Sequence, residues 1–211
     1  MRHLAIILTL FFMSDIAYSY VDLSLNYNFS KRKIDGADTE LSDEDQGQAV
    51  TTTEGWSINW GWFIWEYTAL ELNYSRTSER LVDDRESSNS DGTFTIKEVD
   101  SLVVTEVQGA GLRQSFASRK STIIPSISVG YAQLITSGET TYKVDDNGTD
   151  QEISLERDKE TSNSGYVTLS LRFRLTKLMG LSLSAKSVMP DFDTSKMEDN
   201  LIYSAGFSWV F

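Results

Sequence analysis

The 211-residue sequence contains no cysteine, two prolines and a single histidine. The absence of cysteine excludes disulfides, thiolate nucleophiles and cysteine-ligated metals. The one histidine, His3, lies near the start of the chain, so no histidine general base or nucleophile-activating partner is available further along it. No spacing of Ser, Lys or Asp singles out a nucleophile. We therefore expect a protein that is not an enzyme and that has no cofactor and no metal site.

Basic residues are also scarce relative to acids. The chain holds 19 Lys and Arg against 31 Asp and Glu, a formal net charge of −12. Binding to nucleic-acid phosphates requires clustered Lys and Arg, so nucleic acid is not an expected partner. The composition, 40% hydrophobic with 11% aromatic residues, is that of a folded protein.

Long hydrophobic runs are missing after residue 19: no later stretch approaches the roughly 18 uninterrupted apolar residues that a membrane helix requires. The apolar run at 4–13 follows a basic start and precedes the small residues Ala17 and Ser19, which is the three-part pattern of a secretory signal. We expect a cleaved signal peptide over 1–19 and a mature domain over 20–211. The alternative is a buried strand or short helix, because ten apolar residues cannot span a bilayer as a helix.

From Tyr20 onward, apolar and polar residues alternate in eight segments, as in strands with one apolar and one polar face. The segments are 20–29, 57–64, 69–75, 103–116, 123–135, 167–175, 181–188 and 201–211. Segment 103–116 is irregular at Gly109 and Gly111, and its register does not follow from the pattern. The gaps between segments alternate between long and short, which is typical of an up-and-down meander whose two ends face different surroundings.

Alternation alone does not decide which face points outward. A soluble eight-stranded barrel such as a lipocalin places the apolar face inside, whereas a membrane barrel places it outside. The polar face carries charges of both signs: Asp22, Glu71, Arg113, Arg172, Arg174 and Lys186. Aromatic residues near the strand ends resemble interfacial girdles: Tyr20, Trp56, Tyr74, Tyr166, Tyr203 and Trp209. With the secretory signal, these features favour a polar lumen and a lipid-facing apolar wall. In so narrow a lumen we expect the charges to pair and to hold the barrel together; a gated polar path is the alternative.

The final segment, LIYSAGFSWVF, places Tyr203, Ala205, Phe207, Trp209 and Phe211 at alternate positions. This ending resembles that of the small outer-membrane β-barrel family of the OmpA/OmpX type, as does the segment 66–75, and the resemblance extends over 20–211. It implies an all-β fold, an eight-stranded antiparallel up-and-down transmembrane β-barrel with long extracellular loops, in a bacterial outer membrane. It also implies that Tyr203, Phe207, Trp209 and Phe211 form the signal recognised by the barrel-assembly machinery.

The long gaps, 30–54, 76–102, 136–164 and 189–200, hold 26 acidic and 11 basic residues. Residues 140–144 and 152–156 alternate as strands around the turn signal Asn147-Gly148, which predicts a hairpin rising above the membrane; Asp91-Gly92 suggests a second hairpin. The exposed edge of such a hairpin can accept a partner strand or be blunted by charge. Basic residues just above the first and third segments form a candidate rim for lipopolysaccharide phosphates: Lys31, Arg32, Lys33, Arg76 and Arg80.

These observations favour a non-enzymatic outer-membrane barrel that acts in surface interaction or envelope integrity through acidic extracellular loops, with outer-membrane lipids and an extracellular ligand as partners. The first alternative is a narrow channel for small solutes, as in OmpW-like barrels, because Phe63, Ile124, Leu134 and Val210 are apolar residues on the inward face. A lipid-modifying barrel enzyme is a further alternative, disfavoured by the lack of histidine in the mature chain.

Overall fold

The computed structural model describes residues 20–34, 49–85, 87–88, 94–146, 148–190, 192 and 201–211. The expected signal peptide (1–19) and the Asp91-Gly92 turn lie outside these residues, as does Asn147. None of the described residues forms a helix long and apolar enough to cross a membrane.

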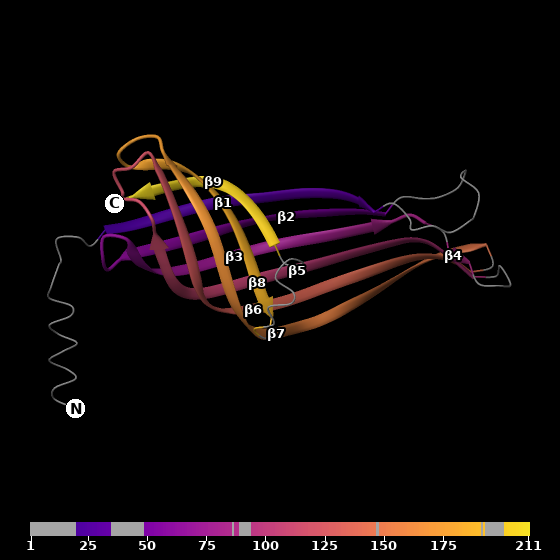
Figure 1. The fold of residues 1–211 in the computed structure, drawn as a ribbon. Helices are drawn as coiled ribbons and strands as arrows, with labels where there is room; N and C mark the ends of the chain where they lie inside the picture. Colours follow the sequence, from indigo (N-terminus) through magenta and orange to yellow (C-terminus); the bar gives the residue numbers. More distant parts are fainter. Residues whose placement is uncertain are drawn as a thin grey trace, which may run out of the picture.

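The described chain is built from antiparallel strands (Figure 1). They are β1 (Tyr20–Ile34), β2 (Ala49–Phe63), β3 (Thr68–Asp83), β4 (Ser87–Ser88), β5 (Phe94–Ser115), β6 (Ile123–Asp146), β7 (Thr149–Arg174), β8 (Met179–Pro190) and β9 (Leu201–Val210). The sheet order is β3-β2-β1-β9-β8-β7-β6-β5-β4, and β3 also pairs with β5. The sheet therefore closes into a ring of eight long strands, with β4 as a short appendage on β5. The predicted up-and-down barrel is confirmed.

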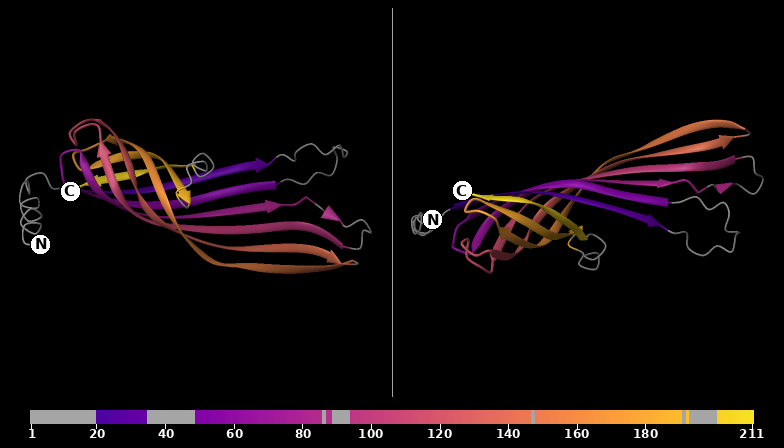
Figure 2. Two further views of the ribbon diagram at one scale, coloured as in Figure 1. Left: turned by 60° about the horizontal axis from the view of Figure 1, so that its bottom comes forward. Right: turned by 90° about the horizontal axis from the view of Figure 1, so that it is seen from above.

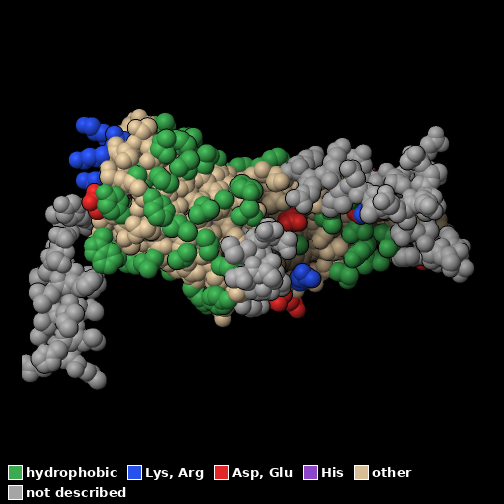
Figure 3. Space-filling model, viewed as in Figure 1, with side chains coloured by type: hydrophobic (Ala, Val, Ile, Leu, Met, Phe, Trp, Pro, Cys, Tyr) green, Lys and Arg blue, Asp and Glu red, His purple; other side chains and the backbone are tan. Residues whose placement is uncertain are grey.

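The barrel is apolar outside and polar inside. Leu23 and Leu25 on β1 are exposed, whereas Asp22, Ser24 and Asn26 between and beside them are buried. The same alternation leaves other large apolar side chains on the outer wall exposed: Trp60, Trp62, Leu70, Leu72, Leu112, Val129, Leu169, Leu183 and Phe207 (Figure 3). Such a wall is stable only against hydrocarbon, because in water it would expose a large continuous apolar surface. The soluble arrangement of the barrel is thereby excluded.

Two members of the expected aromatic girdle were placed on the wrong face. Tyr20 and Tyr166 are buried in the lumen, at 8% and 1% exposure, because strand alternation puts Tyr20 on the same side of β1 as Asp22. Trp56 and Tyr203 do lie on the outer wall, at 39% and 70% exposure. Whether an aromatic residue near a strand end faces lipid or the lumen thus depends on whether its position in the strand is odd or even, and not on its aromatic character.

Several strands run well past the barrel, so most residues of the three longest gaps are strand rather than loop (Figure 2). We call this region the extension; it comprises residues 49–54, 76–83, 94–106, 136–146 and 149–163. The β6–β7 ladder continues to the pair Asp146↔Thr149, so the predicted hairpin around Gly148 is confirmed. The short turns between β2 and β3, β5 and β6, and β7 and β8 lie at the other end of the barrel, where Val21 and Phe211 are hydrogen-bonded to each other.

The irregular segment 103–116 forms an unbroken ladder with β3, from Asp83↔Val99 to Thr68↔Gln114. Gly111 pairs with Gly130 on β6, and the Tyr166 ring lies against both glycines; a Cβ on either would collide with that ring or with backbone. Gly111, one of the two glycines that disturb the sequence pattern, therefore leaves the space that the buried Tyr166 requires, whereas Gly109 lies against the Asn73 side chain.

Candidate functional site

A network of buried ion pairs crosses the middle of the lumen. Arg113 Nη2 donates to Asp22 Oδ1 at 2.5 Å, and Arg113 Nε lies 3.1 Å from Glu71 Oε2. Arg172 donates to the second carboxylate oxygen of Asp22, and Ser128 Oγ donates to Glu71 Oε2 at 3.2 Å. These side chains come from β1, β3, β5, β6 and β7. The network therefore ties together walls of the barrel that are far apart in the sequence.

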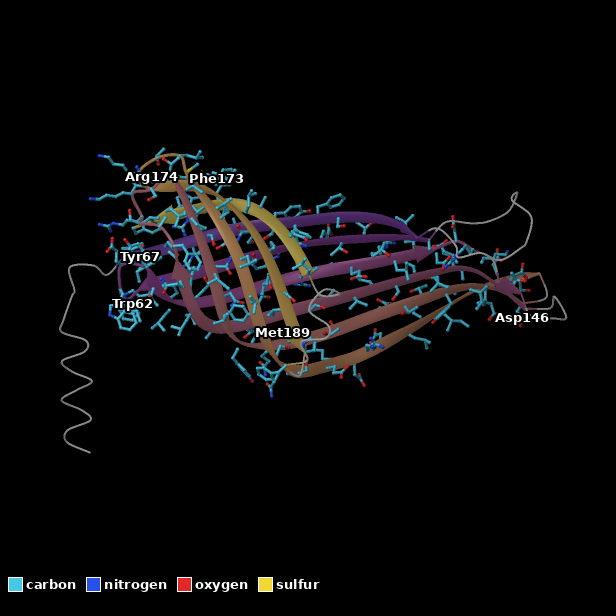
Figure 4. All side chains as sticks on the ribbon, in the orientation of Figure 1. Trp62, Tyr67, Asp146, Phe173, Arg174 and Met189 are labelled. Carbon is cyan, nitrogen blue, oxygen red and sulfur yellow. The ribbon has the colours of Figure 1, made fainter. Side chains whose placement is uncertain are left out.

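The remaining two predicted lumen charges lie apart from this network. Lys186 Nζ donates to Asn73 Oδ1 at 3.1 Å and lies 5.3 Å from the centre of the Tyr166 ring. Arg174 is at the end of β7, near the short turns, where it donates to the Arg119 carbonyl (Figure 4). Among the described residues, Arg174 forms no ion pair.

Two residues of the network were missed at the sequence level. Ser128 supplies a hydrogen bond to Glu71, and Gly61 leaves the space that the Arg113–Asp22 pair occupies: a Cβ at Gly61 would overlap Arg113 Nη2 and Asp22 Oδ1. The available signal was a glycine at an inward position between Trp60 and Trp62.

Apolar layers close the lumen on both sides of the ion pairs. At one end Tyr20 and Phe63 stack with ring centroids 4.0 Å apart, beside Ala69 and Val210. Towards the extension a second layer consists of Val107, Ala132, Tyr166 and Val188, with Leu134 packed against it. The polar cavity between the layers, lined in part by Ile124, measures about 30 Å³, room for about two water molecules. Of the apolar inward residues that favoured a channel, Phe63, Leu134 and Val210 belong to these layers, and Ile124 lines the cavity between them.

The polarity of the two faces is reversed in the extension. On β6, Tyr142 and Val144 continue the inward row of Ala132 and Leu134, and their cross-strand partners share that face. The inner face is therefore largely apolar; it carries Ile96, Val99, Val103, Tyr142, Val144, Ile153 and Leu155, together with the charged residues Glu79, Asp83 and Arg157. The outer face carries most of the charged residues. On β6 this change occurs at unchanged parity, as expected where a strand passes from lipid into water, whereas the bulge between Glu160 and Arg157 changes the parity of β7.

Ion pairs connect neighbouring strands on the outer face of the extension. Arg80 Nη2 lies 2.5 Å from Asp100 Oδ2, and Lys143 Nζ lies 2.8 Å from Glu98 Oε2. Lys97 Nζ reaches Asp150 Oδ1 at 2.6 Å and Asp145 Oδ2 at 3.0 Å, and Arg76 lies 3.9 Å from Glu106. The Arg80 hydrogen bond holds the pKa of Asp100 below its ordinary value, and the Lys97 hydrogen bond does the same for the pKa of Asp145.

The predicted basic rim is distributed over β1 and β3. The ladders place Lys31 opposite Thr52 and Thr52 opposite Arg80, so these positions share one row across three strands. Arg76 and Arg80 are engaged with Glu106 and Asp100. For residues 31–34, including Arg32 and Lys33, the structure describes the backbone alone.

Within the described part of the chain, no group of three His, Cys, Asp or Glu side chains is placed to hold a metal ion. The expected assembly signal lies on β9 and just beyond it. Tyr203, Phe207 and Phe211 are exposed on the outer wall, and Trp209 is half-buried on the same face.

No family model and no curated protein matches the sequence. Among solved structures, the outer membrane protein OprG from Pseudomonas aeruginosa superposes with a TM-score of 0.51 at 9% identity, over 92% of this chain and 95% of that chain. The N-terminal β-barrel domain of P. aeruginosa OprF gives 0.48 at 12% identity, over 92% and 98%. Ail of Yersinia pestis, in complex with the heparin analogue sucrose octasulfate, gives 0.45 at 12% identity, over 92% and 99%. The chain has the fold of the small outer-membrane β-barrels.

Proposed function

We propose that this protein is a non-enzymatic integral protein of the bacterial outer membrane that binds a basic partner at the cell surface. The binding surface is the outer face of the extension. The observation that carries the proposal is an uncompensated acidic region there: Arg76, Arg80, Lys97 and Lys143 are already paired with acids. Glu156 on β7 is exposed, lies opposite Glu139 and forms no ion pair with any described residue. The exposed Glu152 lies opposite Lys143, which is paired with Glu98. A surface with one excess sign of charge attracts and steers partners of the opposite sign.

A contribution to envelope integrity through lipopolysaccharide is compatible with this proposal. Lys31, Arg32 and Lys33 are the candidates for contacts with lipid phosphates, since Arg76 and Arg80 already have acidic partners. Recognition of the last strand by the barrel-assembly machinery would deliver the protein to the membrane. Both partners are proposed from the sequence and from the position of these residues on β1, β3 and β9.

The proposal is tested with the purified barrel in detergent micelles and a fluorescent lysine-rich peptide. Glu156→Lys should weaken binding and reduce its salt dependence, because it removes an acid from the extension and adds a base. Glu66→Lys is the matched control: it makes the same charge change in the turn between β2 and β3, at the opposite end of the barrel. Equal effects of the two variants, or no binding at low salt, would contradict the proposal.

A narrow channel is less well supported by the geometry. The ion-pair network of Asp22, Glu71, Arg113 and Arg172 lies across the lumen between two apolar layers. A permeating solute would have to break buried ion pairs, which is costly. This arrangement favours the structural role of the lumen charges.

A further inference from the structure

In the described part of the chain, the strands that run past the barrel leave two free edges: that of β1, whose ladder with β9 stops at Tyr27↔Ala205, and that of β7. β7 pairs with β6 from Thr149 onward, but its other neighbour, β8, begins to pair only at Ser164↔Pro190. Residues 149–163 therefore have no neighbouring strand on that side among the described residues, and residues 149–161 are all exposed (Figure 1, Figure 2). Along such an edge, half of the backbone amides and carbonyls point away from the sheet and are available to another strand.

A β-bulge limits the usable part of this edge. The ladder shifts register between Thr136↔Glu160 and Gly138↔Arg157, so β7 carries one residue more than β6 over this interval. Bulges bend and twist an edge strand and interrupt regular pairing. The regular edge is therefore 149–157, which at about 3.3 Å per residue offers roughly 30 Å for a partner strand.

The two faces of this edge differ in chemistry. Asp150, Glu152 and Glu156 lie on the charged outer face. Glu156 is opposite Glu139, Glu152 is opposite Lys143, and Asp150 is opposite Asp145, with which it shares Lys97. Ile153 and Leu155 lie on the inner face and remain 42% and 58% exposed. An added strand would place alternate side chains beside each row, because successive residues of a strand point to opposite faces.

The β7 strand of a second copy is a poor occupant of the edge. Two copies in one membrane run in the same direction, and parallel pairing would bring the acidic rows of the two β7 strands together. Antiparallel pairing also brings them together, because residues opposite each other share a face. Like charges directly opposite are destabilising. The acidic row therefore disfavours pairing with a second β7 strand and favours pairing with a basic strand.

We infer that β7 residues 149–157 bind a partner segment by strand addition, and that this segment alternates basic side chains with aliphatic ones. Its basic residues lie beside Asp150, Glu152 and Glu156, and its aliphatic residues extend the apolar inner face beyond Ile153 and Leu155. This inference rests on the proposed function and specifies the partner: an extended segment, five to nine residues long by the length of the regular edge (about 3.3 Å per residue).

The test uses the full-length barrel in micelles and three synthetic peptides. The first alternates Lys and Val over seven residues, the second has the same composition with Lys and Val in separate blocks, and the third is the alternating peptide with N-methylated amides. Strand addition predicts that the alternating peptide binds best. The block and N-methylated peptides should bind about tenfold more weakly or worse, because they lose face matching or backbone hydrogen bonds. Hydrogen exchange should slow at residues 149–157 on binding of the first peptide only.

Two variants distinguish peptide binding by strand addition at the β7 edge from binding by general electrostatic attraction. Glu152→Lys should abolish the preference for the alternating peptide, whereas Glu54→Lys, an equal charge change on exposed β2, should preserve it. If all three peptides bind alike and Glu152→Lys weakens them equally, the acidic surface binds basic partners but strand addition is refuted. If none of them binds even at low salt, the proposed function itself fails.

Discussion

At the scale of single residues, the central feature is a carboxylate that accepts hydrogen bonds from two guanidinium groups. Asp22 receives Arg113 on one oxygen and Arg172 on the other. Alternation in the sequence predicted that all three face inward. It did not predict which charges meet, because pairing depends on strand register and on the space that Gly61 leaves.

Asp22→Asn should destabilise the barrel by about 3–5 kcal/mol, because it leaves two buried guanidinium groups with one carboxylate partner fewer. Urea unfolding in lipid vesicles, followed by tryptophan fluorescence, measures the free energy of unfolding. In the double variant with Arg172→Gln the loss should be smaller than the sum of the single losses, since the two residues share one interaction. Additive losses would contradict the coupling.

At the scale of elements, β9 combines an interior role with an exterior one. Its inward Ser208 is buried, while Phe207 and Phe211 face outward. The Phe211 side chain is 72% exposed, and its amide donates to the Val21 carbonyl at 2.8 Å. The backbone of Phe211 helps to close the barrel, and its phenyl side chain is free for recognition.

Phe211→Ala should lower the amount of assembled barrel in cells without a matching loss of stability once the barrel is folded. The variant keeps the backbone hydrogen bonds to Val21, so its refolded barrel should resemble Leu201→Ala, which removes an exposed apolar side chain at the other end of β9. Heat-modifiable gel migration of membrane fractions measures assembly. Normal yield of Phe211→Ala would argue against an assembly signal.

The extension should loosen in acid before the barrel does. The pKa values of Asp100 and Asp145 are lowered in the folded protein by Arg80 and Lys97, so these ion pairs stabilise the extension fully above about pH 4. Their contribution is lost as the pH falls through the lowered pKa values. Hydrogen exchange of 94–106 and 136–146, corrected for intrinsic rates, should accelerate first. Arg80→Met should reduce this pH dependence at 94–106; exchange that is insensitive to acid in the parent protein would refute the assignment.

At the scale of the whole molecule, a lipid-facing barrel is joined to an extension with the opposite distribution of polarity. Strands such as β6 and β7 pass through both parts without a break. The barrel is closed, and the described strands beyond it are open along β7 and along β1. One continuous sheet therefore combines a membrane-spanning barrel with the surface that we propose for binding.

The purified protein should give no steady single-channel openings in a planar bilayer. The ion pairs across the lumen and the apolar layers on both sides leave a cavity of about 30 Å³. The double variant Arg113→Ala, Arg172→Ala is the comparison. If its barrel still folds, it should leak more ions than the parent protein. Steady openings of the parent protein would favour the channel.

Much of the fold could be predicted from local pattern. The eight alternating segments, the polar lumen and the hairpin around Gly148 follow from periodicity and turn chemistry, which act over a few residues. The full lengths of β5, β6 and β7 could not, because 76–102 and 136–164 are polar and, apart from the two suggested hairpins, were expected as loops. Polar sequences form strands there only because each has a neighbour to pair with.

The sequence by itself determined that one face of each strand is apolar and the other polar. It also determined that the acidic residues gather in the long connections, which lie at one end of the barrel. Only the tertiary structure decided that Asp22 meets Arg113 and Arg172 and that β7 has an unpaired edge. The physical reason is range. Alternation is a property of neighbouring residues, whereas ion pairing and edge exposure depend on which strands close the ring and where each ladder stops.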